Sequence, residues 1–333
     1  MKTEFIFNRT DVVKDIHCYE SENVSCLMVI TPSTIRVLLY LFLGSLSVLT
    51  MCGNLLIIIS IIYFKQLHTP ANYLILSLAM ADLLVGALVL PFSIAVSVSS
   101  CWHLADLICK IGRSLDVSLS TSSILNLCFI SIDRYYAVCQ PLRYRTKISS
   151  HAAVIMIMVS WGVSILLGIG LIIMGLNEGK CEGRCFSFHI PISSIPGCIF
   201  SFYLPAIIML SIYLKIFLVA QRQARSIKNT NCQGIKSGAS VSKMERKATK
   251  TLAIVMGAFL ICWTPSFIGM TSDPLSNYSI PIAVIEIFAL FGWSNSVLNP
   301  FVYAFFYSWF RVAFRIIISG KIFQGDFANS KLF

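Results

Sequence analysis

Two charged residues at the ends of one apolar stretch have types and a spacing that favour a functional role. Asp116 and Arg134 are eighteen residues apart in the segment 109–141. At about 3.6 residues per helical turn this is close to five turns, so both side chains leave the same face, about 27 Å apart along the axis. That length approaches the thickness of a membrane's hydrocarbon core, about 30 Å. Because a charge inside a membrane is costly, the pair predicts a helix that senses at one surface and reports at the other.

Each of these charges also has a structural interpretation. Asp116 could pair with Arg113, one turn earlier on the same helix, although an arginine can also extend outward to the membrane surface. Arg134 could contact lipid phosphates. Glu245 opens a later helix on the same side of the membrane and offers Arg134 an alternative partner.

A second carboxylate, Asp82, falls in the middle of another apolar run, LSLAMADLLVG. A lone carboxylate there needs a cation, a proton or several hydrogen-bond donors. Ser123, Asn295 and Asn299 carry the hydroxyl and amide groups that a small cation binds. We expect a sodium ion at these four residues, and the alternative is a purely structural hydrogen-bond network.

The composition indicates a membrane protein of the all-α class. Hydrophobic residues make up 56% of the 333 residues, charged residues 12%, and the mean hydropathy is +0.79. No ordinary soluble domain has such values. Apolar runs long enough to cross a bilayer as helices cover residues 36–63, 71–98, 106–139, 151–175, 191–221, 248–271 and 280–306. The sequence therefore predicts a bundle of seven transmembrane helices.

The distribution of lysine and arginine predicts the orientation of the bundle. These residues concentrate after the first, third, fifth and seventh spans. The positive side of a membrane protein faces the cytoplasm, so we expect the N-terminus outside the cell, at the plasma membrane. This topology, and not a nucleic-acid partner, explains the net charge of +11. The predicted parts are an extracellular segment 1–35, a bundle 36–306 with a cytoplasmic loop 222–247, and a cytoplasmic tail 307–333.

The beginning of the predicted tail has the pattern of a helix that lies on a membrane surface. Residues 308–319 place Trp309, Phe310 and Phe314 on one face and Arg311 and Arg315 on another. Apolar and basic faces of this kind bind the lipid interface. We therefore expect membrane lipid to contact this short amphipathic helix.

Cysteines and glycosylation sequons agree with the predicted orientation. The sequons begin at Asn8, Asn23 and Asn277, all on the outer side. Six cysteines also fall on that oxidising side, where disulfides form, and they allow fifteen pairings. These cysteines are Cys18, Cys26, Cys101, Cys109, Cys181 and Cys185.

Two other function classes lack the residues that they need. An enzyme would need a metal-binding histidine cluster, a nucleophile elbow or a phosphate-binding loop, and the sequence contains none of these. A secondary transporter would show internal repeats with interrupted helices in matching halves, and we find no such repeats.

An ordered set of motifs covers all seven spans and resembles the rhodopsin-like G-protein-coupled receptors. Asp116, seven residues after Cys109, is similar to the amine-binding aspartate of aminergic receptors. The runs NSVLNPFVYAFFYSWF and FISIDRYYAVCQPLRY resemble those of trace amine-associated receptors. Each motif is common alone, but the set in this order is specific. The motifs are Asn54, LAMAD ending in Asp82, Asp133-Arg134-Tyr135, Trp161, Pro205, Cys262-Trp263-Thr264-Pro265 and Asn299-Pro300-Phe301-Val302-Tyr303.

The resemblance implies an amine pocket in the outer part of the bundle. Asp116 would pair with the ligand's ammonium group, and Trp263 and Phe267 would cover its ring. The implied ligand-binding residues are Asp116, Val117, Ser120, Ser201, Trp263, Ser266, Phe267 and Trp293.

Two of these residues depart from the family's pattern and bear on specificity. Ser266 stands where an aromatic residue is usual, and Trp293 stands where tyrosine is usual and could add a cation–π contact. Ser201 is the main polar contact on the fifth span, which has no hydroxyl pair for a catechol and no second acid for a diamine. We therefore expect a small monoamine and not a catecholamine or polyamine.

The resemblance also implies a switch that links the pocket to the cytoplasm. Arg134 and Glu245 would form a lock that holds the sixth span in, and agonist binding would shift a two-state equilibrium by its differential affinity. The opened face would admit a heterotrimeric G protein, Gs with a cAMP response, and arrestin is a further expected partner. The implied switch residues are Ile124, Arg134, Pro205, Tyr213, Glu245, Phe259 and Tyr303.

The family further suggests three disulfides, Cys109 with Cys185, Cys18 with Cys181 and Cys26 with Cys101. Two functional alternatives stay open beside the trace amine receptor. One is another aminergic receptor, serotonin-like or adrenergic-like, and the other is an amine transporter.

Overall fold

The computed structural model describes residues 33–98, 106–177, 195–230, 238–276 and 279–321. The predicted sequons and every predicted outer cysteine except Cys109 lie outside these ranges, as does most of the segment 1–35. The described residues form helices: α1 (Ser33–Tyr63), η2 (Lys65–Leu67), α2 (Pro70–Leu84), η3 (Val85–Val89), α3 (Leu90–Val98), α4 (Asp106–Cys139), α5 (Pro141–Lys147), α6 (Ser150–Asn177), α7 (Ile195–Cys198), η5 (Ile199–Tyr203), α8 (Leu204–Thr230), α9 (Gly238–Leu275), α10 (Ile282–Phe306) and α11 (Ser308–Ile318).

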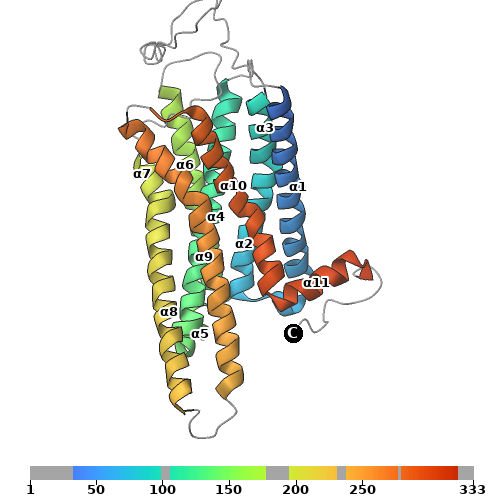
Figure 1. The fold of residues 1–333 in the computed structure, drawn as a ribbon, viewed down its shortest axis with the longest axis vertical. Coiled ribbons are helices and arrows are strands. Elements are labelled where there is room, and N and C mark those ends of the chain that lie inside the picture. The colour runs from blue at the N-terminus through green and yellow to red at the C-terminus, as the bar shows by residue number, and fades with distance from the viewer. Residues whose placement is uncertain (1–32, 99–105, 178–194, 231–237, 277–278, 322–333) are drawn as a thin grey trace, which may run out of the picture.

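The long helices stand side by side as an upright bundle (Figure 1). Six spans are long and apolar enough to cross a membrane, and a seventh, in α10, meets α11 at a bend of 99°. The six are Val37–Tyr63, Pro70–Val96, Leu107–Cys139, Ser150–Ile173, Ile195–Arg222 and Ile254–Leu275. This arrangement confirms the predicted all-α bundle with a short helix after the last span.

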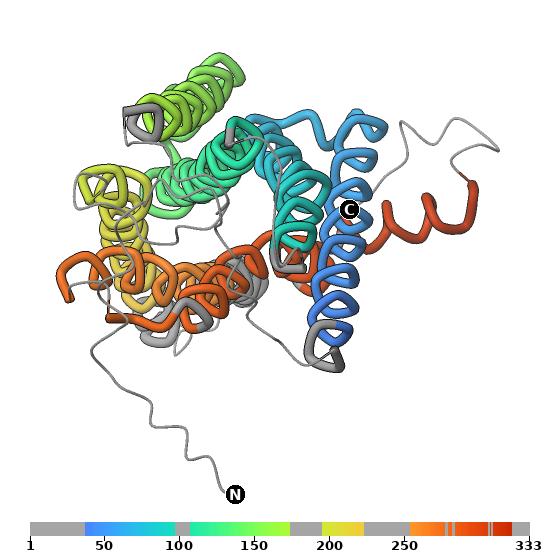
Figure 2. Tube along the Cα trace, turned by 90° about the horizontal axis from the view of Figure 1, so that it is seen from above, coloured from blue at the N-terminus to red at the C-terminus, as the bar shows by residue number. Residues whose placement is uncertain are grey.

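Helix α4 organises the bundle because it contacts α2, α6 and α8. Helix α6 packs against α4 and α2 and lies at the periphery in the view from above (Figure 2). Only 17% of the most apolar part of this span is buried inside the protein, and Leu166 is 70% exposed. Exposed leucine and isoleucine on a long apolar helix are stable where lipid, not water, surrounds them.

Polar side chains join the helices inside the bundle, where each one needs a partner. Asn54 on α1 donates to the carbonyl of Ser296 on α10 at 3.0 Å. Trp161 on α6 donates from its indole nitrogen to the hydroxyl of Ser77 on α2, also at 3.0 Å. Asn54 therefore forms a hydrogen bond between α1 and α10.

Two short π-helical segments precede prolines in the middle of spans. Val85–Val89 ends two residues before Pro91, and Ile199–Tyr203 ends two residues before Pro205. A proline removes one backbone N–H and its ring clashes with the preceding turn, and a π-helical turn relieves both effects without ending the helix. By contrast, Pro265 lies inside the continuous helix α9 and Pro300 inside α10.

The segment 222–247 stays a predicted cytoplasmic connection, and the structure shows that much of it is helical. Helix α8 continues to Thr230, and α9 already begins at Gly238. Hydropathy locates the membrane boundary and not the end of a helix. Arginine, lysine, glutamine and alanine are strong helix formers, so these helices extend beyond the apolar part of the spans.

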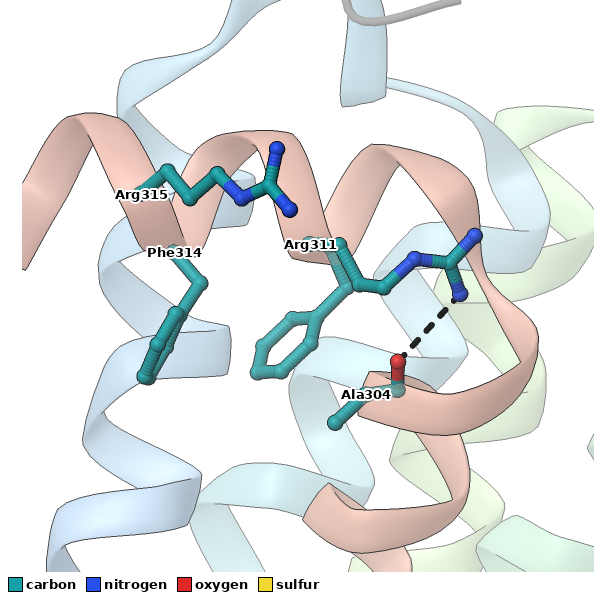
Figure 3. Close-up of a pocket in the computed structure, with 5 residues that line it drawn as sticks. Ala304, Arg311, Phe314 and Arg315 are labelled. Carbon is teal, nitrogen blue, oxygen red and sulfur yellow. Dashed lines mark hydrogen bonds between the residues drawn. The ribbon is translucent and has the colours of Figure 1, made fainter.

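Helix α11 leaves the bundle and packs against α1 (Figure 1). Trp309, Phe310 and Ala313 are buried in a cluster that includes Ile57 and Ile61 of α1. Phe314 (Figure 3), predicted on the same apolar face as Trp309 and Phe310, is 38% exposed and is not part of the buried residues of this cluster. These residues anchor α11 on α1, Val312 and Ile316 pack partly against the same cluster, and Phe314 and Ile318 are exposed.

Candidate functional site

Asp116 lies on the inward face of α4, where a neighbouring turn and a second helix hold its side chain. Its Oδ1 atom accepts a hydrogen bond from the Ser120 hydroxyl at 3.2 Å and another from Trp293 Nε1 of α10 at 2.9 Å. Both bonds end on the same oxygen. Within the described residues, Oδ2 accepts no hydrogen bond.

The alternative partner of Asp116, Arg113, is also near the site. Arg113 lies one turn earlier on α4 and interacts electrostatically with Asp116. The hydrogen bonds of the carboxylate nevertheless go to Ser120 and Trp293. The intrahelical attraction therefore accompanies the contact to α10 and does not replace it.

A buried aromatic cluster joins α9 to η5. Phe267 stacks on Phe202 with ring centroids 4.4 Å apart and an interplanar angle of 6°. Trp263 lies 5.9 Å from Phe267 at 50°. Phe202 was not predicted from the sequence, although Cys198, Phe202 and Ala206 recur every four residues, a helical spacing that indicates a common buried face.

Among the other predicted ligand-binding residues, two serines hydrogen-bond to backbone carbonyls and a valine lies beside Asp116. Ser201 of η5 is buried and its hydroxyl donates at 3.5 Å to the carbonyl of Cys198, three residues earlier at the end of α7. Ser266 is buried and donates to the carbonyl of Phe288, which ties α9 to α10. Val117 is half-buried beside Asp116 on α4. The hydroxyl of Ser266 therefore serves the contact between two helices.

Asp82 on α2 is fully buried and has three hydrogen-bond donors. Ser123 of α4 and Ser296 of α10 each donate to Oδ1 at 2.8 Å, and Asn299 donates to Oδ2 at 2.7 Å. Ser123 and Asn299 were predicted here, and Ser296 was missed although it lies one turn before Asn299. Asn295 is buried, but its amide nitrogen has no partner among the described residues.

At the other end of α4, Arg134 forms an ion pair with its neighbour Asp133. The Tyr144 hydroxyl, on α5, donates to the second oxygen of Asp133 at 2.9 Å. The side chain of Glu245 lies outside the described part of the structure, so its contact with Arg134 stays a prediction. In this structure the arginine is held by its own helix.

The remaining switch residues lie in packed positions. Ile124 and Phe259 are buried in one cluster with Phe202, and Pro205 is the second residue of α8, just after η5. The other two of these predicted switch residues are tyrosines. Tyr213 accepts a hydrogen bond from Ser131 at 3.1 Å, and Tyr303 is buried where α10 meets α1.

Comparison with known proteins identifies the family to which these features belong. The profile of the family described as 7 transmembrane receptor (rhodopsin family) matches residues 53–303. Trace amine-associated receptor 1 of Macaca mulatta is 45% identical over 331 residues, which cover 95% of this chain and 98% of that protein. The chain belongs to the trace amine-associated receptors of the rhodopsin family.

Further relatives agree with this assignment of the receptor. Trace amine-associated receptor 1 of Homo sapiens is 44% identical over 95% of this chain and 97% of its own length. Trace amine-associated receptor 4 of Mus musculus is 40% identical over 95% of this chain and 94% of its own length. The receptor is therefore a multi-pass membrane protein, and its relatives are receptors and not enzymes.

One part of the disulfide prediction concerns a described residue of the receptor. Cys109, near the N-terminal end of α4, is disulfide-bonded. The other described cysteines are free, so its partner lies outside the described residues. The pairing of Cys109 with Cys185 stays a prediction, as do the pairings of Cys18 with Cys181 and Cys26 with Cys101.

Proposed function

We propose that small biogenic monoamines activate this receptor and that it transmits agonist binding to the heterotrimeric G protein Gs, which raises cAMP. The observation that carries the proposal is the geometry of Asp116. Two neutral donors hold one carboxylate oxygen, and the other oxygen has no donor among the described residues. This arrangement suits a positively charged amine.

The position of Asp116 inside the bundle strengthens the attraction between its carboxylate and an ammonium group. Two unit charges about 4 Å apart attract by about 1 kcal/mol in water and about 4 kcal/mol at an effective dielectric constant near 20. Ser120 and Trp293 also fix the carboxylate before a ligand arrives, which lowers the entropy cost of binding. An ammonium group therefore gains more here than at an exposed carboxylate.

The neighbouring side chains favour an amine with a small aromatic group. Trp263 and Phe267 supply ring surfaces, and Ser201 supplies a hydroxyl on η5. The relatives are named for trace amines, which supports an amine ligand. Phenylethylamine-like and tyramine-like compounds meet these requirements better than catecholamines or polyamines.

We also propose that the receptor lies in the plasma membrane with its N-terminus outside and holds a sodium ion at Asp82. The serine hydroxyls that now donate to Asp82 can instead turn a lone pair to a cation, and the carboxylate supplies the negative charge. These oxygen donors fit a small hard cation. Ser123, Ser296 and Asp82 would hold the ion, and Asn295 and Asn299 lie on the adjoining face of α10.

The test is a cAMP assay with a panel of aromatic and volatile amines on the wild type, Asp116→Ala and Asp116→Asn. Both variants are expected to lose the response while surface expression persists, because each removes the negative charge and the asparagine keeps the shape. Equal potency in wild type and variants would remove Asp116 from the site. Activation by diamines alone would overturn the monoamine class, and flux of labelled amine without cAMP would indicate a transporter.

A further inference from the structure

Glu286 on α10 is a carboxylate that neither the amine site nor the sodium site uses. It is the one charged residue in the sequence of α10, and it falls inside the apolar span Val284–Phe305. An ionisable side chain in such a span is costly and faces the bundle interior or a water-filled cavity. It lies beyond the first turn of the helix, where an acid would serve the helix dipole. Glu286 therefore needs another explanation.

Glu286 has no protein partner in the part of the chain that the structure describes. Its side chain is half-buried and forms no hydrogen bond or ion pair with any described residue. Arg113, the cation beside the amine site, interacts electrostatically with Asp116. A charge that is partly removed from water is stabilised by an opposite charge, so a half-buried carboxylate of this kind favours a bound cation.

Glu286 shares a face of α10 with Trp293. The two residues are seven positions apart, close to two turns, so their side chains leave nearly the same face about 10 Å apart along the axis. Ile287, which points away from this face, is 50% exposed, whereas Trp293 is 9% exposed. Glu286 lies on the side of Trp293 that is farther from α11, towards the other end of the bundle (Figure 1).

The face of α10 that contains Glu286 and Trp293 places two carboxylates at different depths of the bundle. Trp293 Nε1 donates to Asp116 Oδ1 at 2.9 Å, so the Asp116 carboxylate lies beside the Trp293 side chain. Between Trp293 and Glu286 this face carries Ala289 and Leu290, which pack partly against the same apolar cluster as Trp293. The order along the face is therefore a carboxylate, an apolar stretch and a second carboxylate.

We propose that Glu286 is a second ammonium subsite, which binds the far end of an amine whose first ammonium group contacts Asp116. This inference rests on the proposed function, because it extends the amine site that Asp116 begins. The ligand class is an aliphatic diamine with an amine at each end of its chain and about 10 Å between the two nitrogens. The fifth span has no second acid, and α10 supplies it instead. Monoamines use only the part of the site at Asp116.

The distance between the two carboxylates selects the length of the diamine. An extended chain advances at most about 3.6 Å for every three bonds. The nine bonds between the nitrogens of octamethylenediamine, an eight-carbon chain with two terminal amines, therefore span about 11 Å. The five bonds of the four-carbon diamine span about 6 Å and do not reach both carboxylates. Long diamines are expected to bind by both ends, and short ones by one end.

The test compares octamethylenediamine with octylamine, which has the same chain and one amine. Affinity for the purified full-length receptor is measured from the rise of its thermal midpoint with ligand concentration. Glu286→Gln is expected to lower the diamine affinity about fivefold, the equivalent of about 1 kcal/mol, and to leave the octylamine affinity unchanged. Because either end of the diamine can reach Asp116, only the preference that this variant loses belongs to the second subsite.

Two further variants exclude a merely structural role of Glu286. Glu286→Asp keeps the charge on a shorter side chain, so the diamine that binds best should be longer than in the wild type. Glu286→Lys should lose the diamine preference and favour the eight-carbon amino acid that carries a carboxylate in place of the second amine. An equal loss of diamine and octylamine affinity in Glu286→Gln, or no loss of either, would overturn the proposal.

Two measurements separate this proposal from the proposed function. A wild type without a cAMP response to phenylethylamine would reject the monoamine function. A normal phenylethylamine response without a diamine preference that depends on Glu286 would reject the second subsite alone. Asp116→Ala is expected to weaken diamine binding, because one molecule contacts both carboxylates. Unchanged diamine affinity in Asp116→Ala would show that no molecule bridges them and would also overturn the proposal.

Discussion

Trp293 Nε1 donates a hydrogen bond to Asp116 Oδ1 at 2.9 Å, across 177 residues of sequence. The bond joins α10 to α4 at the carboxylate that the amine is proposed to contact. An indole N–H can only donate and does not titrate, so it fixes the orientation of the carboxylate without competing for its charge. The carboxylate is therefore aimed before any ligand binds.

Removal of this donor is expected to weaken agonist binding. In Trp293→Phe the carboxylate keeps Ser120 as its hydrogen-bond donor among the described residues and becomes less well oriented. A hydrogen bond to a charged group is worth about 1.5–3 kcal/mol, so agonist potency in a cAMP assay should fall roughly tenfold to a hundredfold. Trp293→Tyr restores a donor and should recover part of the loss. Unchanged potency in Trp293→Phe, at equal surface expression, would contradict this role.

The Asp82 cluster predicts that sodium and agonist affect each other's affinity. If the ion is bound in the inactive arrangement, replacing KCl by NaCl should lower agonist affinity in the wild type, by roughly tenfold within the usual range of coupling free energies. Asp82→Asn removes the negative charge and should abolish the difference between the two salts. Radioligand competition in membranes measures the agonist affinity in each salt. Equal agonist affinity in both salts for the wild type would reject a sodium site.

Gly168 is expected to be indispensable for the packing of α6 against α4. A side-chain carbon at this position would come within 2.9 Å of the Ser114 carbonyl oxygen and would also collide with the Ser118 hydroxyl. Overpacking of this kind costs about 1–3 kcal/mol, so Gly168→Ala should lower the thermal midpoint of the purified receptor. Gly170 on the same helix has no atom within 4 Å of such a carbon, which makes Gly170→Ala the matched control. Equal midpoints for the two variants would show that α6 can shift freely.

The bond from Tyr144 to Asp133 predicts a pH effect on stability. Burial and the nearby Asp133 carboxylate raise the pKa of Tyr144 from 10.0 to about 12. Because the folded state favours the neutral phenol, this stabilisation is complete below pH 10 and is lost as the pH rises towards about 12. Tyr144→Phe should therefore be less stable than the wild type by about 1–2 kcal/mol at neutral pH.

The measurement for Tyr144 is the thermal midpoint of the wild type and of Tyr144→Phe across a pH series. The difference between them should be constant through neutral pH and should shrink above pH 10. Tyr136→Phe, at a half-buried tyrosine on α4, serves as the control. A difference that already disappears near pH 7 would show that the phenol is not the group responsible.

The sequence by itself determined the seven spans, the short amphipathic helix and the family. Apolar runs of sufficient length must become helices in a membrane, because every backbone group there needs an internal partner. Asp82 and Asp116 could be selected from the sequence for a related reason, since a carboxylate inside an apolar run is costly without a function. The continuation of α8 to Thr230 and the start of α9 at Gly238 were not predicted, because hydropathy does not mark where a polar helix ends.

Only the tertiary structure decided which side chains meet. Three contacts join residues of different helices, and the rotation of one helix against another sets such contacts. They are Trp293 with Asp116, Ser296 with Asp82, and Phe202 with Phe267. The same rotation turned Ser266 to the Phe288 carbonyl. A single chain's sequence specifies the face of each helix but not the angle at which two faces meet, because that angle results from the packing of all the helices together.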